Sequence, residues 1–176
     1  HKTMGLERMV PFSSWNLIIF GLYFISVSAL GWFDLFNLDS SKFLHFSSGM
    51  LLPMSLGMSM LTATTVTYVI IPNEVNSDRD YNHLFKTHEM VMHNWTVILI
   101  SIDVVLSQPD LDWQLAIFGL VIGIIYTTFA YLFALFGGGY YVYSFIDPRI
   151  KYGPIIMIIL ALAISLFYVC LCQKIF

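Results

Sequence analysis

Residues 89 to 107 read EMVMHNWTVILISIDVVLS, a stretch apolar enough to cross a bilayer. It carries His93 near one end and Asp103 well inside the run. A carboxyl group in hydrocarbon costs roughly 2.5 to 3.5 kcal/mol on insertion scales, so chains keep one there when it has a buried partner or a function. The stretch therefore predicts a transmembrane helix that packs against other helices.

One face of this predicted helix is polar. At about 100° per residue, positions three or four apart share a face. The residues on this face are His93, Thr96, Ile100, Asp103 and Ser107. We expect the face to point into a helix bundle, with Thr96, Asp103 and Ser107 forming a polar core.

Asp103 needs a partner outside its own helix, because it lies about 15 Å along the helix axis from His93. The candidates on the preceding apolar run are Thr64, Thr65 and Tyr68. In a structural interpretation, the acid joins two helices by a hydrogen bond. In a functional interpretation, the polar face forms a catalytic or lipid-headgroup site, and the sequence leaves both open.

The composition assigns the chain to a membrane. Of its 176 residues, 58% are hydrophobic and only 11% are charged, whereas a soluble domain carries about 25% charged residues. The mean hydropathy is +0.78. A net charge of -3 argues against a nucleic-acid partner. We therefore expect an integral membrane protein.

Four further apolar runs accompany residues 89–107, and they cover about 14–36, 47–71, 113–136 and 154–172. Each run is roughly 19 to 25 residues long, as a hydrocarbon core about 30 Å thick requires. The predicted fold is all-α, an integral membrane bundle of five transmembrane helices in one domain covering 1–176. Because the chain begins with His1 and not Met, we expect that it lacks its native N-terminus.

Single residues refine this prediction. Pro53 should kink the second span and Pro72 should end it. Trp15 suits an aromatic belt at the membrane surface. Gly119 and Gly123 are four residues apart and predict close packing against a neighbouring helix of the same chain, with dimerisation as the alternative.

The basic residues predict an orientation. One side of the membrane would hold Lys2, Arg8, Arg79, Lys86, Arg149 and Lys151, and the other only Lys42 and Lys174. Basic loops favour the inner side, so we expect the N-terminus on the cytoplasmic or matrix side.

This orientation brings three segments to the inner face: the starts of the first and third spans and the segment before the fifth. We expect a cavity there, lined by Ser13, Ser14, Trp15, His93, Tyr143 and Asp147. The spacing by fives of His83, His88 and His93 does not place two ligands on one helix face, as a zinc helix requires. We therefore predict no metal site and no cofactor.

Three motifs in order resemble the rolling-stone-like and androgen-induced families of multi-pass membrane proteins. They are FSSWNLIIFGLYF at 12–24, His93 followed by Asp103 and Ser107, and GGGYYVYSFIDP at 137–148. The resemblance runs from about Phe12 to the C-terminus.

Members of the androgen-induced family are membrane hydrolases of fatty acid esters of hydroxy fatty acids, with an intramembrane Thr nucleophile and a His base. The resemblance implies that His93 is the base. The position of the Thr is Ile19 here, which has no hydroxyl, so Ser13 or Ser14 would have to act as nucleophile.

Two functions follow as predictions. In the first, the chain is a non-catalytic accessory or structural subunit of a larger membrane assembly, with a lipid-binding polar cavity. In the second, it is an intramembrane lipid-ester hydrolase with His93 as general base. The expected partners are membrane lipids and other membrane protein subunits.

Overall fold

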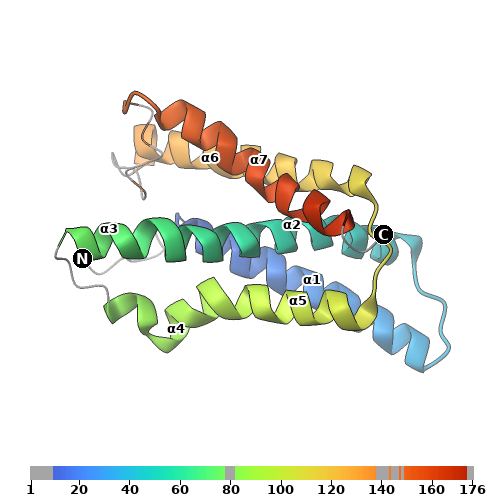
Figure 1. The fold of residues 1–176 in the computed structure, drawn as a ribbon. Helices are drawn as coiled ribbons and strands as arrows, with labels where there is room; N and C mark the ends of the chain where they lie inside the picture. The colour runs from blue at the N-terminus through green and yellow to red at the C-terminus, as the bar shows by residue number, and fades with distance from the viewer. Residues whose placement is uncertain (1–9, 78–81, 138–142, 144–146, 148, 174–176) are drawn as a thin grey trace.

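The second span is the axis of the fold. A computed structural model describes residues 10–77, 82–137, 143, 147 and 149–173. Helix α2 (Lys42–Thr65) continues through a π-helical turn, η2 (Val66–Ile70), into α3 (Ile71–Asn76). Residues 51–59 of α2 are buried without exception, so other helices surround it. Figure 1 shows α2 between the α6–α7 pair on one side and α1 and α5 on the other.

The remaining elements complete a bundle of alternating direction. The first span is α1 (Phe12–Leu35), and the fifth is α7 (Gly153–Cys172). The short 3-10 turn η3 (Asn82–Phe85) precedes the third span, which consists of α4 (Thr87–Met90), the π-helical turn η4 (Val91–Trp95) and α5 (Thr96–Ser107). The fourth span begins with the 3-10 turn η5 (Trp113–Leu115), continues as α6 (Ala116–Leu132) and ends with the π-helical turn η6 (Phe133–Gly137).

Five helices in the described part of the chain are long and apolar enough to cross a membrane. The predicted all-α five-helix bundle is therefore confirmed, with each boundary within a few residues except at the second span. That span runs from Lys42 to Asn76, longer than the expected 47–71.

The expectation that Pro72 ends the second span is wrong. Pro72 lies in the first turn of α3, where its missing N–H removes no hydrogen bond that the turn requires. The wider turn η2 immediately before it relieves the clash between a proline ring and the preceding helical carbonyl. The helix therefore passes through the proline without stopping.

Local chemistry sets several helix ends. The Ser41 side chain accepts a hydrogen bond from the Leu44 N–H and caps α2. Asn37 adopts a left-handed conformation with φ 52° just after α1, a conformation that asparagine tolerates well. Gln108, at φ 44°, ends α5 in the same way, and Pro109 follows it.

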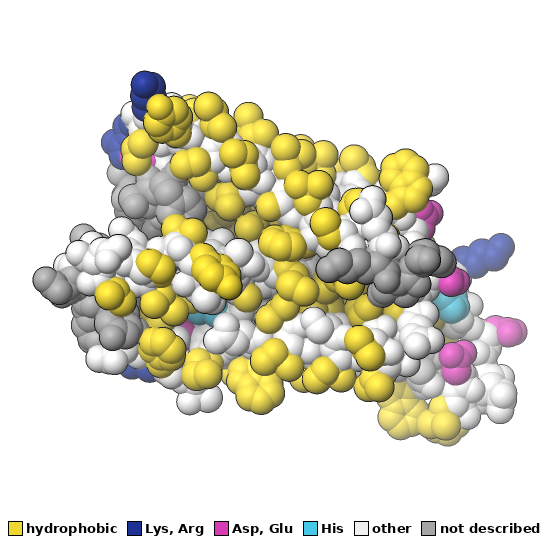
Figure 2. Space-filling model, viewed as in Figure 1, with side chains coloured by type: hydrophobic (Ala, Val, Ile, Leu, Met, Phe, Trp, Pro, Cys, Tyr) yellow, Lys and Arg dark blue, Asp and Glu magenta, His cyan; other side chains and the backbone are white. Residues whose placement is uncertain are grey.

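The outer surface fits an integral membrane protein. Figure 2 shows hydrophobic side chains across the middle of one face and charged side chains towards its ends. Large apolar side chains stand outward from several helices, among them Ile25 at 68% and Val105 at 70% exposure. In a bilayer these positions would contact lipid, whereas in water they would be costly.

Glycines determine where α7 lies. A Cβ atom at Gly57 of α2 would collide with the main-chain oxygen of Ile164, and one at Gly123 of α6 would meet the main chain of Ala161. A Cβ atom at Gly119 would lie 3.2 Å from the Ile164 side chain and 3.3 Å from the Ser165 hydroxyl, closer than an ordinary van der Waals contact. Gly119 and Gly123 thus pack against a helix of the same chain. Figure 1 shows the α6–α7 pair diverging from α2 towards the α3 end.

Candidate functional site

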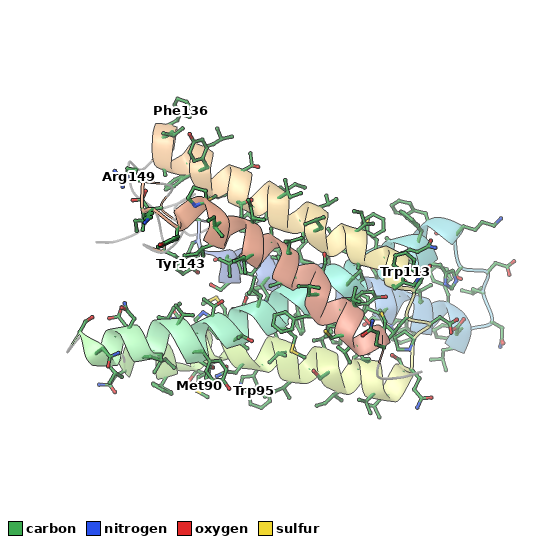
Figure 3. All side chains as sticks on the ribbon, turned by 45° about the horizontal axis from the view of Figure 1, so that its top comes forward. Met90, Trp95, Trp113, Phe136, Tyr143 and Arg149 are labelled. Carbon is green, nitrogen blue, oxygen red and sulfur yellow. The ribbon has the colours of Figure 1, made fainter. Side chains whose placement is uncertain are left out.

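A cavity lies in the wedge where α6 and α7 diverge from α2. Its empty space measures about 580 Å³, counting its open mouth. The walls come from all five spans and from the segment before α7. The lining residues are Phe12, Leu61, Thr62, Thr65, Val66, Ile70, His93, Gly123, Tyr126, Thr127, Tyr143, Leu160, Ala161 and Ile164. Figure 3 shows Tyr143 beside the start of α7, at the end where the helices diverge.

The walls are more apolar than the list of residue types implies. The Thr62 hydroxyl donates to the Met58 carbonyl oxygen at 2.8 Å, and the Thr127 hydroxyl lies 3.0 Å from the Gly123 carbonyl oxygen. Both hydroxyls are satisfied by their own helices. The Tyr126 hydroxyl donates to the Val10 carbonyl oxygen at 3.1 Å. The polar cavity expected from the sequence is therefore a mainly apolar one with a few polar groups.

His93 is the exception among these groups. It is 7% exposed, and its Nδ1 atom has no hydrogen-bond partner among the described residues. Its other ring nitrogen, Nε2, lies 3.6 Å from Oε2 of Glu89, one turn earlier on the same span. A buried polar atom without a partner is unusual in folded proteins and calls for an explanation.

Tyr143, from the segment before α7, also lines the cavity. Burial raises the pKa of Tyr143 to about 12; the Phe12 backbone N–H opposes this rise, and the nearby Glu89 carboxylate adds to it. The phenol is thus neutral at physiological pH. The rest of the predicted glycine–tyrosine segment, apart from Gly137 and Asp147, lies outside the described residues.

A second polar group of residues lies deeper in the bundle, between α1, α2 and α5. The Asn16 side-chain amide donates to the Thr96 hydroxyl at 3.2 Å, and the Ser59 hydroxyl donates to the Asn16 carbonyl oxygen at 3.0 Å. Asn16 and Ser59 have no measurable exposure and Thr96 has 1%. Each member is hydrogen-bonded, so this network has the features of a satisfied structural core.

Asp103 finds its partner on α1. The Tyr23 hydroxyl donates to Asp103 Oδ2 at 2.6 Å. Tyr23 thus takes the place of the partners expected on the second span. Of those, Thr64 and Tyr68 are exposed, and Thr65 lines the cavity. Ser107, expected in the polar core, is exposed, and its hydroxyl donates to the Asp103 carbonyl oxygen at 2.7 Å.

The residues expected to line one cavity separate into two groups. His93 and Tyr143 line it, whereas Ser13, Ser14 and Trp15 are not among its lining residues. Ser13 is buried at 5% exposure, beside the cavity residue Phe12. The Trp15 ring packs against Tyr126, with 5.7 Å between ring centroids.

Asp147 is also not among the lining residues. Its carboxylate accepts two hydrogen bonds from the Arg149 Nε atom, each 2.9 Å, and one from Nη2 at 2.6 Å. These bonds hold the pKa of the Asp147 carboxyl below its usual range. This pair belongs to the turn before α7.

Sequence reasoning missed Glu89, Asn16 and Tyr23. Glu89 was the first residue of the deciding stretch, and its four-residue spacing from His93 was the available signal. Asn16 and Tyr23 are seven residues apart, as Thr96 and Asp103 are. Matching polar spacings on two helices could have indicated the pairing.

Comparison with protein-family models, with curated proteins and with solved structures found no match for this chain.

Proposed function

We propose that this multi-pass membrane protein binds a lipid-like amphiphile in the cavity beside His93. The observation that carries the proposal is the Nδ1 atom of His93, which has no hydrogen-bond partner in the described part of the chain and lies on the wall of a mainly apolar cavity. An apolar chain would fill the wedge, and a polar head would supply the hydrogen bond that the imidazole lacks. Ligand sites in proteins commonly combine apolar walls with a few placed polar groups.

The position of the cavity supports a lipid as the ligand. Its walls are made by helices that can cross a membrane, and Tyr143 lies at the end where the chain leaves the bundle. An amphiphile in the bilayer has its head at that level and its chain among the helices. The apolar wall from Leu160 to Ile164 on α7 would contact the chain.

A pair of neighbouring threonines gives a matched test. Thr127 lines the cavity, whereas Thr128 is exposed on the outer face of the same helix. Lipid retained by the purified protein is measured by native mass spectrometry. We expect Thr127→Phe to remove most bound lipid and Thr128→Phe to leave it unchanged. Equal retention by both variants at equal stability would refute the proposal.

The role of an accessory subunit in a larger membrane assembly is compatible with this binding function. The outer face of α1 supports it, because Leu22 and Ile25 are 47% and 68% exposed and could contact another membrane subunit as well as lipid. Co-purification with other membrane proteins at a fixed stoichiometry, in mild detergent, is the expected result. A monodisperse, partner-free protein extracted from its native membrane would count against it.

A second candidate function is lipid-ester hydrolysis. Asn16 and Thr96 are hydrogen-bonded and 80 residues apart, and Ser13 and His93 share that separation one turn nearer the membrane surface. Glu89 beside Nε2 would orient the imidazole, and Nδ1 would take the Ser13 hydroxyl proton as the oxygen attacks an ester carbonyl. The C–O bond to the alcohol would break, the alcohol would leave with the proton from Nδ1, and water would then release the acyl group from Ser13 as the acid. Fluorophosphonate labelling tests this candidate.

The labelling experiment has its own control in Ser14. The hydrolase function predicts labelling that Ser13→Ala and His93→Ala abolish and that Ser14→Ala leaves intact. Absence of labelling in active membranes, or labelling that survives His93→Ala, would leave non-catalytic lipid binding as the function.

A further inference from the structure

We infer that the head of the bound amphiphile is a neutral hydroxyl, as in a fatty alcohol, a monoacylglycerol or a sterol, and not a carboxylate, phosphate or amine. This inference rests on the proposed function, because it specifies the ligand of the same cavity. Three features of the described residues support it: the charge beside His93, the direction in which the imidazole can accept a hydrogen bond, and the apolar walls of the cavity.

Among the described residues, the charged side chain nearest the His93 ring is negative. None of the described lining residues is Lys or Arg, and the charged side chain beside His93 is Glu89, whose carboxylate is 24% exposed. Of the described basic residues at this end, Arg149 is held by Asp147, and Lys151 lies over the Tyr152 ring. Lys86 and His88 are exposed and are not among the lining residues, although His88 Nε2 lies 3.3 Å from Glu89 Oε1. An anionic head would approach the Glu89 carboxylate with no cation on the cavity wall to compensate it, which disfavours both carboxylates and phosphates.

The imidazole selects a hydrogen-bond donor. In a neutral ring one nitrogen carries the proton and the other accepts. A lone pair on Nε2 would face the Glu89 carboxylate oxygen 3.6 Å away, so the proton belongs on Nε2. Nδ1 is then the acceptor, and a hydroxyl group satisfies it. An ester or ether oxygen has no proton to donate.

The apolar walls narrow the class of head group further. A cationic amine could also donate to Nδ1, but burying a charge against apolar walls such as Leu160 and Ile164 is costly.

A matched ligand series tests the inference. The full chain in detergent is titrated with oleyl alcohol, oleyl methyl ether, oleic acid and oleylamine, and bound ligand is measured by native mass spectrometry. The pH is held near 8, where a histidine of ordinary pKa, about 6.5, is neutral. We expect the alcohol to bind about tenfold more tightly than the ether, the difference that one hydrogen bond makes. The acid and the amine should bind no better than the ether.

Two variants assign the preference to its residues. His93→Phe should bind alcohol and ether equally, and Glu89→Gln should narrow the difference between alcohol and acid. His93→Gln, which keeps a polar group, covers the case in which the phenylalanine variant does not fold. An acid or amine that binds as well as the alcohol, or an alcohol preference that survives His93→Phe, would overturn the inference.

The series also separates this inference from the proposed function. If all four ligands bind alike and Thr127→Phe displaces them all, the cavity binds lipid and the head-group inference is wrong. If none binds, or if Thr127→Phe displaces none, the proposed function itself is wrong.

Discussion

The Tyr23 hydroxyl donates a 2.6 Å hydrogen bond to Asp103, two helical turns beyond the bond from Asn16 to Thr96 that joins the same two spans. Both pairs are separated by 80 residues. A constant separation means that α1 and α5 run parallel in one fixed register. The acid inside the third span therefore connects two membrane helices, and Ile100 fills the layer between the two bonds at 0% exposure.

Removing the Tyr23 hydroxyl should lower the free energy of unfolding by the contribution of one interhelical hydrogen bond. We expect Tyr23→Phe to cost about 0.5 to 1.5 kcal/mol of unfolding free energy, the range for polar contacts between membrane helices. The measurement is reversible unfolding in mixed micelles, followed by circular dichroism. Tyr131→Phe is the control, because Tyr131 is 41% exposed on α6.

A double-mutant cycle tests whether the effect belongs to the pair. Asp103→Leu removes the other partner, and the double variant with Tyr23→Phe should cost less than the sum of the single variants. Additive costs would show that Tyr23 and Asp103 stabilise the bundle independently, contrary to the geometry.

Two serines one turn apart on α2 should respond differently to substitution. Ser59→Ala would leave the buried carbonyl oxygen of Asn16 without its donor, so we expect a cost of about 1 to 3 kcal/mol. Ser55 is equally buried, but its hydroxyl has no partner among the described residues, so Ser55→Ala should be neutral or stabilising. The measurement is the free energy of unfolding of the two variants under identical conditions. A larger cost at Ser55 than at Ser59 would contradict the network.

The fold followed from the sequence because a bilayer imposes a length on each apolar run. Five runs of that length leave few arrangements other than a helical bundle. Pro72 was misjudged for a physical reason: a proline stops an ordinary α-helix, but the wider turn at Val66–Ile70 accommodates it. That turn depends on the surrounding helices, and no local sequence pattern predicts it.

The site was predictable only in part. His93 and Tyr143 were expected at one end of the bundle, and both line the cavity. The partner of Asp103 was sought on the second span, because a single sequence does not reveal which helices are neighbours or in what register. Ile164, which approaches Gly57 closely, also lines the cavity, and this tertiary contact between the second and fifth spans was not predicted from the sequence.

The turn before α7 should show a pH dependence. The hydrogen bonds from Arg149 lower the pKa of the Asp147 carboxyl from its ordinary value of 3.8. Because the folded pKa is the lower one, the stabilisation is complete above the unfolded pKa and is lost as the pH falls through the folded value. We expect Arg149→Gln to return the pKa of Asp147 towards 3.8, as measured by carbon NMR of labelled aspartate. Lys151→Gln should leave this pKa unchanged, and an Asp147 that titrates normally in the unaltered protein would show that the pair does not form in solution.

Gly57→Ala should be among the most damaging single substitutions in the bundle. The added methyl would collide with the Ile164 main-chain oxygen, and a backbone atom cannot move aside as a flexible side chain can. Since α7 must then shift away from α2, we expect a loss of about 1 to 3 kcal/mol of unfolding free energy, the usual cost of overpacking.

Gly21→Ala is the matched control: it is also a helical glycine, and a Cβ there would meet nothing within 4 Å. Because alanine is the better helix former, Gly21→Ala should be neutral or stabilising by up to about 1 kcal/mol. The same shift would change the wedge that forms the cavity, so Gly57→Ala should also weaken lipid retention, whereas Gly21→Ala should not. Equal stability of the two variants would mean that α7 does not cross α2 at Gly57.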